Sequence, residues 1–233
     1  MAKQKPKRYR AQSEKVEVDK LYEPLEACNV VTSTGSTKFD ETIDVAIGLG
    51  VDPRKADQNI RGAVPLPHGL GKEIRVAVFA KGEKAIEAKE AGADIVGDAD
   101  LAEEIKNGNI NFDAMIATPD MMANVGKVGK ILGPRGLMPS PKVGTVTFNV
   151  KEQVKALKAG QADYRVDKAG IIHACIGKAS FGGEKIKDNL DTLIQAINKA
   201  KPSTSKGVYL KTCFMSATMG PSVKVDPSAL RNV

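Results

Sequence analysis

The chain has 233 residues, a formal net charge of +7 and a hydrophobic content of 42%, enough for one large domain or two modest ones with a real core. The positive excess favours a polyanionic partner such as nucleic acid, although a merely basic soluble protein has the same balance. Cys28, Cys175 and Cys213 lie far apart in the sequence, which predicts buried thiols in a reducing compartment and excludes a disulfide framework or a Cys-x-x-Cys zinc site. No apolar run reaches membrane-spanning length, so we expect no membrane partner.

The N-terminal residues 1–10 are basic and have no apolar segment behind them. A secretory signal needs such a segment, so we expect a mobile arm that contacts phosphate or is only solvated. Between residues 42 and 47 apolar side chains alternate with polar or small ones. This period of two predicts a half-exposed strand.

The middle of the chain alternates strand-forming and helix-forming segments. Branched and aromatic residues predict strands at residues 73–79, 93–96, 112–117 and 145–148. Helix formers predict helices at residues 83–91, 101–107 and 150–159, and Pro119 is expected to open a further helix in its first turn. Strand–helix repeats of this length predict a parallel sheet with helices packed on it.

The C-terminal part has a different pattern. Residues 164–167 and 171–176 predict a hairpin around residues 168–170, and residues 208–217 predict the last long strand. Apolar residues at helical spacing between 184 and 199 predict an amphipathic helix. Neither end of the chain has enough elements for a core of its own, so we expect the two ends to combine.

We therefore predict an α/β protein with a discontinuous α+β outer domain, residues 1–67 plus 160–233, and an inserted three-layer, Rossmann-like α/β domain, residues 68–159. Two connections near residues 67–69 and 159–161 would allow hinge motion. Residues 160–233 hold 11 basic and 6 acidic residues, so they supply most of the positive excess.

Charge is also segregated within the inserted domain. Residues 81–120 have 4 basic and 10 acidic residues, whereas residues 121–159 have 7 basic and 1 acidic. The basic half is a candidate second nucleic-acid surface. Arg135 and Lys142 lie in a loop rich in glycine and proline at residues 132–142. This loop is either a contact to an RNA backbone or a structural crossover, and the residues alone leave both interpretations open.

Motifs for catalysis are weak. Gly126-Lys-Val-Gly-Lys130 and Gly69-Leu-Gly-Lys72 lack the spacing of a phosphate-binding loop, and Ile131 or Glu73 stands where a metal-binding hydroxyl is needed. His68 and His173 have no nucleophile or carboxylate arrangement around them. We expect no enzyme, no metal and no cofactor, and we expect His68 to pack or hydrogen-bond near the first connection. The rival interpretation is an α/β enzyme that acts on a phosphorylated small molecule with its central domain.

Three short polar segments lie at the ends of the predicted outer-domain strands. They contain Lys38, Phe39 and Thr42, then Lys178, Ser180 and Phe181, and finally Ser216, Thr218, Met219 and Gly220. If these strands are neighbours in one sheet, hydroxyls and backbone amides gather at its rim and meet the 2′-hydroxyls of the shallow RNA minor groove. Gly220 would allow close approach and the lysines would neutralise phosphates. Ordinary strand ends are the open alternative.

Seven motifs follow one another along the chain: Lys38-Phe-Asp-Glu-Thr42, Asp57-Gln-Asn-Ile-Arg-Gly62, Leu66-Pro-His-Gly-Leu-Gly-Lys72, Ala117-Thr-Pro-Asp120, Ile131-Leu-Gly-Pro-Arg-Gly-Leu-Met-Pro139, Gly177-Lys-Ala-Ser-Phe181 and Thr218-Met-Gly-Pro-Ser222. In this order the motifs resemble the bacterial large-subunit ribosomal protein L-one family, which forms the mobile stalk beside the tRNA exit site. The resemblance covers nearly the whole chain, and its weakest parts are the extreme termini.

The resemblance implies a two-domain ribosomal protein whose outer domain binds a helix-and-loop structure in large-subunit ribosomal RNA. It also implies a cytoplasmic location on the ribosome, contact with deacylated tRNA at the exit site, and repression of the protein's own messenger RNA through a mimic of the ribosomal site. The family's main RNA contacts correspond to Phe39 and Thr42, to residues 177–181, and to Thr218, Met219 and Gly220. Further expected partners are the rest of the large subunit, and off the ribosome we expect a monomer.

Overall fold

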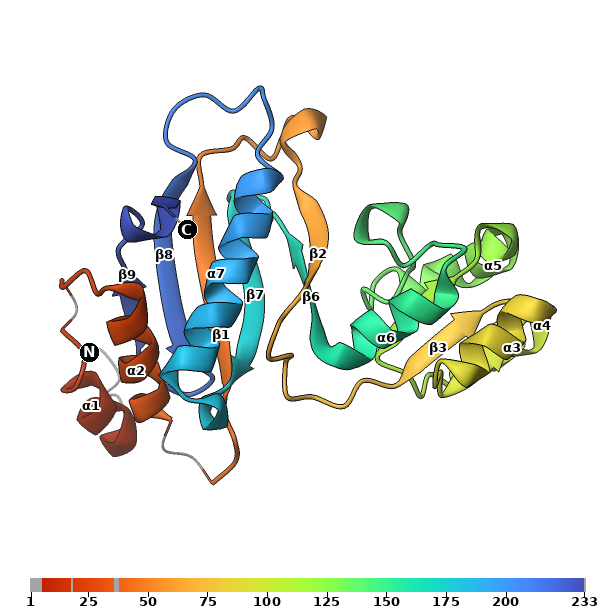
Figure 1. The fold of residues 1–233 in the computed structure, drawn as a ribbon, viewed down its shortest axis with the longest axis horizontal. Coiled ribbons are helices and arrows are strands. Elements are labelled where there is room, and N and C mark those ends of the chain that lie inside the picture. Colours follow the sequence, from red (N-terminus) through yellow and green to blue (C-terminus); the bar gives the residue numbers. More distant parts are fainter. Residues whose placement is uncertain (1–5, 18, 36–37, 233) are drawn as a thin grey trace. The chain divides into compact units, whose positions relative to one another are not determined.

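A computed structural model of the chain describes residues 6–17, 19–35 and 38–232. The chain forms two compact units, an outer unit of Met1–Gly71 with Ala162–Val233 and an inserted unit of Lys72–Gln161 (Figure 1). The first division falls after Gly71 because His68 and Gly69 are hydrogen-bonded to a helix of the outer unit.

The outer unit is built on an antiparallel sheet of order β7-β1-β8-β9. Its strands are β1 (Thr42–Leu49), β7 (Ile171–Lys178), β8 (Leu210–Ala217) and β9 (Ser222–Val225). The alternation that predicts a half-exposed strand is present in β1, where Ile43, Val45 and Ile47 are buried and Asp44 is exposed. One face of the sheet is therefore apolar and needs a cover.

Helices α2 (Pro24–Thr34) and α7 (Gly183–Lys199) supply this cover and pack against each other (Figure 1). Helix α7 buries Ile186, Leu190, Leu193 and Ile197, which recur at a helical spacing and form one apolar stripe. These side chains share a single core with the buried face of β1. The amphipathic helix predicted over residues 184–199 is thus present and supports the sheet.

A second sheet of the outer unit has two strands, β2 (Arg61–Pro65) and β6 (Gln161–Arg165). The predicted hairpin between residues 164 and 176 is therefore wrong in its pairing, because β6 pairs with β2 and touches β7 only at an isolated Val166–Ile172 bridge. The predicted turn is present, since Gly170 donates its N–H to the Asp167 carbonyl. Local sequence signals predict the turn correctly, whereas the pairing of β6 with β2 depends on contacts between residues far apart in the sequence.

The inserted unit has a parallel sheet of order β4-β3-β5. Val76 and Val78 of the central strand belong to one apolar cluster, and Ala77 and Phe79 belong to another. Helices cover both faces, as the continuous apolar run of β3 requires. The elements are β3 (Val76–Phe79), α3 (Glu83–Glu90), β4 (Ile95–Gly97), α4 (Ala99–Lys106), β5 (Ala114–Ala117), α5 (Met122–Leu132) and α6 (Val150–Gly160). The α/β fold class is confirmed.

Several local predictions are wrong. The expected arm lies partly outside the described residues, which exclude 1–5, and residues from Lys7 onward form helix α1 (Lys7–Ser13). Gln12 fastens this helix by donating to the Thr34 carbonyl at 2.6 Å. Residues 145–148 form no strand and contribute only a Val146 bridge to Ala117. Strand β9 follows the strand that was expected to be the last.

Helix α2 is not evident from sequence because it contains Val30, Val31, Thr32 and Thr34, which are weak helix formers. Its packing against α7 and the sheet outweighs that preference. Short 3₁₀ turns complete the described chain: η1 (Ala56–Gln58), η2 (Pro119–Met121), η3 (Pro141–Val143), η4 (Ala179–Phe181) and η5 (Ala229–Asn232).

Candidate nucleic-acid interface

Three polar segments meet at one end of the outer sheet. Thr42 is paired with Lys178 of β7, and Ile43 is paired with Ala217 of β8. Because both neighbours of β1 are antiparallel to it, their last residues lie beside its first. We call this end of the sheet the rim and define it as residues 38–42, 178–181 and 216–220. The condition stated for the sequence prediction, that these strands be neighbours in one sheet, is met.

The Thr218 hydroxyl is held by the backbone of Thr42. Its oxygen accepts the Thr42 N–H at 3.1 Å and donates to the Thr42 carbonyl at 3.1 Å, and the Thr218 N–H reaches the same carbonyl at 3.0 Å. A hydroxyl has one proton and two lone pairs, so one lone pair is left for another donor. Thr218 therefore fixes the start of β1 and offers RNA an acceptor only.

Lys178 also bonds to Thr42, through the Thr42 side chain. Its Nζ donates to the Thr42 hydroxyl at 2.9 Å and lies 3.4 Å from the Asp40 carbonyl. This leaves the ammonium with a further N–H, and it leaves the Thr42 hydroxyl with its own proton. Ser180 is exposed, and its N–H and hydroxyl donate to the two carboxylate oxygens of Asp40 at 3.1 and 2.7 Å. Asp40 thus ties the turn after β7 to the segment before β1.

Glu41 links the segment before β1 to the turn after β8, on the other side of β1. Its side chain is buried, with an exposed fraction of 1% for the residue, and its Oε2 accepts the Met219 N–H at 2.9 Å. The apolar side chains of Met219 and Phe39 remain exposed at 48% and 56%. Phe39 also lines a shallow cavity of about 380 Å³, together with Gly35, Asp40 and Ser180. The rim thus combines exposed apolar side chains with fixed polar groups.

Gly220 has a role within the protein besides the one predicted. A Cβ on Gly220 would lie 3.1 Å from the Thr34 hydroxyl, so the glycine makes room for helix α2. Its N–H closes a turn onto the Ala217 carbonyl at 3.0 Å. The structure therefore gives an internal reason for this glycine, in addition to any approach of RNA.

Ser216 lies on the sheet face that α2 and α7 leave uncovered, opposite Asp44 of β1 and Ser222 of β9. Partial burial raises the pKa of Asp44, and the nearby Lys178 and His173 oppose that rise. Ser216 therefore belongs to the rim by position and is the cross-strand partner of Asp44.

The other predicted contacts lie on exposed surface. Lys38 is exposed at the edge of the rim. Arg135 and Lys142 are exposed in the inserted unit, Arg135 after α5 and Lys142 within η3. These two residues form no part of the rim. Sequence reasoning missed Asp40 and Glu41, whose acidic charge gave no signal for an RNA interface.

Comparison with known proteins decides the family. Residues 31–221 match the model of the ribosomal protein L1p/L10e family. The chain belongs to this family. A relative described as large ribosomal subunit protein uL1, from Bdellovibrio bacteriovorus, is 59% identical over 223 residues, which is 96% of this chain and 95% of the relative.

Membership of the ribosomal protein L1p/L10e family confirms the resemblance and the expectation of a non-enzymatic protein. The matched range contains all of the rim together with Arg135 and Lys142. Among the described residues, no group of three or more His, Cys, Asp or Glu side chains is placed to hold a metal ion. Within that same part of the chain, no helix is long and apolar enough to span a bilayer.

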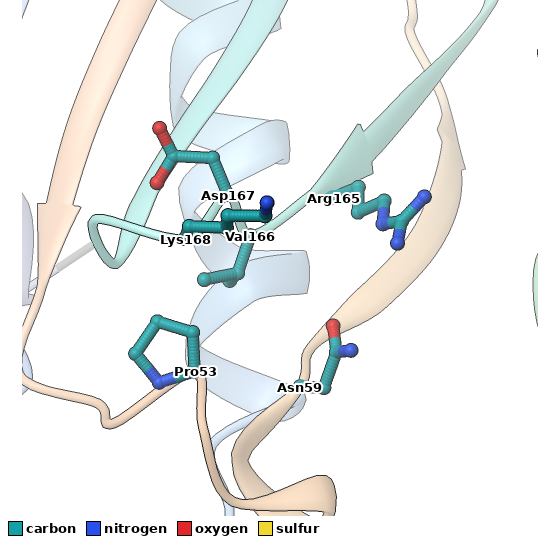
Figure 2. Close-up of a pocket in the computed structure, with 6 residues that line it drawn as sticks. All are labelled: Pro53, Asn59, Arg165, Val166, Asp167 and Lys168. Atoms are coloured by element: carbon teal, nitrogen blue, oxygen red, sulfur yellow. The ribbon is translucent and has the colours of Figure 1, made fainter.

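A second cluster of basic residues, not singled out by the sequence analysis, lies at the opposite end of the outer sheet. Arg165 and Lys168 line a cavity of about 360 Å³ with Asn59 and Pro53 (Figure 2). Strand β1 separates this cluster from the rim, because the Leu49 N–H at its far end donates to Gly170. Eight residues of strand span roughly 25 Å. We call this group the distal basic cluster and define it as Arg54, Lys55, Arg61, Arg165 and Lys168, all exposed.

Asp167 is the acidic residue in the wall of this cavity, and the backbone holds it. Its Oδ1 accepts the N–H groups of Ala169 and Ile171 at 2.8 and 2.9 Å. These bonds, that from Ile171 above all, lower the pKa of Asp167. Its carboxylate is thus engaged in the turn before β7. The basic residues reach this site from residues 54–61 and 165–168, and only folding brings those segments together.

Each histidine lies beside a carboxylate, and two of the three cysteines are buried. His68 lies 3.0 Å from Asp188, and His173 lies 3.8 Å from Asp167. Burial raises the pKa of Cys28 and of Cys213 to about 12, so both thiols remain protonated at neutral pH. The expectation of buried thiols is confirmed for Cys28 and Cys213 and is wrong for Cys175, which is only partly buried.

Proposed function

We propose that this protein is a structural component of the large ribosomal subunit, located with the ribosome in the cytoplasm, and that it binds ribosomal RNA through the rim. The observation that carries this proposal is the convergence of three polar strand ends in a member of the ribosomal protein L1p/L10e family. The description of the 59% identical relative supports the placement in the large subunit.

The rim suits the sugar–phosphate surface of a folded RNA. The remaining N–H of Lys178 and the exposed ammonium of Lys38 would contact phosphates, and the Thr42 hydroxyl proton would be donated to a sugar or phosphate oxygen. The exposed Phe39 and Met219 side chains would pack on ribose or base surface. Internal bonds from Asp40, Glu41 and Thr218 hold these groups before RNA arrives, which lowers the entropic cost of binding.

The same rim would also bind the protein's own messenger RNA. A rim that reads backbone shape accepts any RNA with the same helix-and-loop geometry. A messenger that mimics the ribosomal site would therefore compete for the same residues, and translation of that messenger would fall while free protein is in excess.

The distal basic cluster favours contact with a second RNA, the deacylated tRNA at the exit site. Its five cations lie at the end of the sheet opposite the rim, so they remain free to meet another polyanion while the rim is occupied. Contacts of this kind position phosphates without reading sequence. We also propose that the inserted unit moves about its two connections. Off the ribosome, the protein is a monomer in this proposal.

A titration across salt concentrations tests rim binding. The ligands are a stalk fragment of large-subunit ribosomal RNA and a scrambled duplex of equal length. Tight binding that persists only for the stalk fragment at physiological salt is the expected result. Equal, salt-sensitive binding to both would leave only a basic surface and contradict the proposal. Thermal stabilisation by a nucleotide would instead favour the rival α/β enzyme.

A charge-matched pair of variants tests the tRNA contact. Arg165→Gln with Lys168→Gln should weaken binding of deacylated tRNA and leave binding of the stalk fragment unchanged. Lys15→Gln with Lys106→Gln removes the same charge from exposed positions outside both basic surfaces. If both double variants weaken tRNA binding equally, the effect is one of net charge and the distal cluster is not the contact.

A further inference from the structure

A buried amide side chain makes three hydrogen bonds at the first connection between the units, beside the buried Leu66 and the His68–Asp188 pair. Asn189 of α7 has an exposed fraction of 0%, and its Oδ1 accepts the His68 N–H at 3.1 Å. Its Nδ2 donates to the Gly69 carbonyl at 3.1 Å and to the Ile176 carbonyl at 2.8 Å. A buried amide keeps such bonds because an unpaired partner is costly. Asn189 thus joins residues 66–71 to strand β7.

The strand that Asn189 holds leads into residues 178–181, one of the three segments of the rim. Strand β7 is at the edge of its sheet, where its ladder partner is β1, and the Val166–Ile172 bridge lies at its other end. The Ile176 carbonyl that Asn189 caps lies two residues before Lys178. The amide therefore takes the place of a neighbouring strand at the point where β7 enters the RNA-binding rim.

The connection also contacts the rim side chains. Gly71 has φ +66°, and a Cβ added to it would lie 2.8 Å from Lys178 Cγ and 2.9 Å from Phe181 Cζ. The backbone of Gly71 therefore lies against two of the residues assigned to RNA binding. Leu70 packs on the outer core just before it.

We propose that Asn189 is a positioning residue that couples docking of residues 66–71 to RNA binding at Lys178 and Phe181. The inference rests on the proposed function of the rim. RNA that orders Lys178 and Phe181 stabilises the docked connection packed against them, and a docked connection presents these side chains in one arrangement. Coupling of this kind is reciprocal, so release of the connection weakens RNA binding by the same factor by which RNA favours docking.

Amide hydrogen exchange in the full chain tests the coupling. The reporter is the His68 N–H, whose acceptor is Asn189, measured with and without the ribosomal RNA stalk fragment. RNA should slow its exchange in the wild type. In Asn189→Ala, which loses the accepted bond and both donated bonds, exchange should be fast without RNA, and the affinity should fall roughly 5- to 150-fold. Asn198→Ala, the same change elsewhere on α7, should leave both measurements unchanged.

A glycine pair keeps the test informative if the Asn189 variant fails to fold. Gly71→Ala and Gly82→Ala both place alanine at a positive φ, +66° and +62°, but Gly82 has nothing within 4 Å of the new Cβ. Only Gly71→Ala should weaken RNA binding and speed exchange at His68. Equal affinities of the two variants, or exchange at His68 that RNA does not change, would overturn the coupling while rim binding stands. Absence of specific binding by the wild type would overturn both.

Discussion

The Thr218 side chain and the Thr42 backbone form a closed pair at the start of β1, with the hydroxyl 3.1 Å from both the Thr42 nitrogen and the Thr42 oxygen. The two residues are 176 positions apart in the sequence. Lys178 approaches the same residue from the other neighbouring strand. Thr42 is therefore the centre of the rim, and changes on either side should act through it.

Removal of the Thr218 hydroxyl tests this arrangement. We expect Thr218→Val to weaken binding of the stalk fragment by about 1–3 kcal/mol, because the Thr42 N–H loses the hydroxyl as its acceptor and the start of β1 is held less firmly. The Thr42 carbonyl keeps the bond from the Thr218 N–H. Thr218→Ser keeps the hydroxyl and should bind within about 0.5 kcal/mol of the wild type. Titration by fluorescence anisotropy measures both. Wild-type affinity in Thr218→Val would remove Thr218 from the interface.

The lysines should show their role in the salt dependence. Lys38→Gln and Lys178→Gln should each lower affinity and flatten the slope of log K against log salt by about one unit, since each removes one phosphate contact. Lys106→Gln, an exposed lysine of the inserted unit, is the control. A lower affinity with an unchanged slope would mean that Lys178 only supports Thr42 and does not touch phosphate.

Gly220 separates an internal role from an RNA contact. Gly220→Ala places a Cβ 3.1 Å from the Thr34 hydroxyl and should destabilise the outer unit by about 1 kcal/mol. If the requirement is internal packing, Thr34→Ala in the same chain should restore RNA affinity. If affinity stays low in the double variant, the Cβ obstructs RNA itself. The chain has four tyrosines and no tryptophan, and Tyr9, Tyr22, Tyr164 and Tyr209 all belong to the outer unit, so tyrosine fluorescence follows its unfolding.

Two carboxyl groups of the outer unit should affect stability with opposite signs. Burial raises the pKa of Asp44, so ionisation of Asp44 opposes folding and Asp44→Asn should be more stable than the wild type at pH 7. The difference should vanish below the unfolded-state pKa of about 3.9, where both states hold the proton.

Asp167 is the matched contrast, because backbone donors lower its pKa. Its contribution is present above the unfolded-state pKa of about 3.9 and is lost as pH falls through the folded value. Asp167→Asn should therefore be less stable than the wild type at pH 7 and equal to it at low pH. Urea midpoints between pH 3 and pH 7 measure both variants. The same sign for the two would contradict the assignment of causes.

The sequence by itself determined many of the local elements of this protein and the family, but not α1, α2 or β9. Alternating apolar residues specified β1, the helical stripe specified α7, and apolar runs between helices specified the parallel sheet of the inserted unit. These signals are local, because side-chain period and backbone preference act over a few residues. Where propensity and packing disagreed, as in α2 with its run of β-branched residues, local reasoning did not find the helix.

Only the tertiary structure decided which of these elements meet. The pairing of β6 with β2, the enclosure of the Thr218 hydroxyl by Thr42, the contact of Gly220 with Thr34 and the three bonds of Asn189 all join residues far apart in the chain. Such contacts depend on strand register and helix packing, which no short window of sequence contains. The polar residues of the rim were evident in the sequence, but the bonds already formed within it were not, because a hydroxyl or amide is equally suited to a protein partner and to RNA.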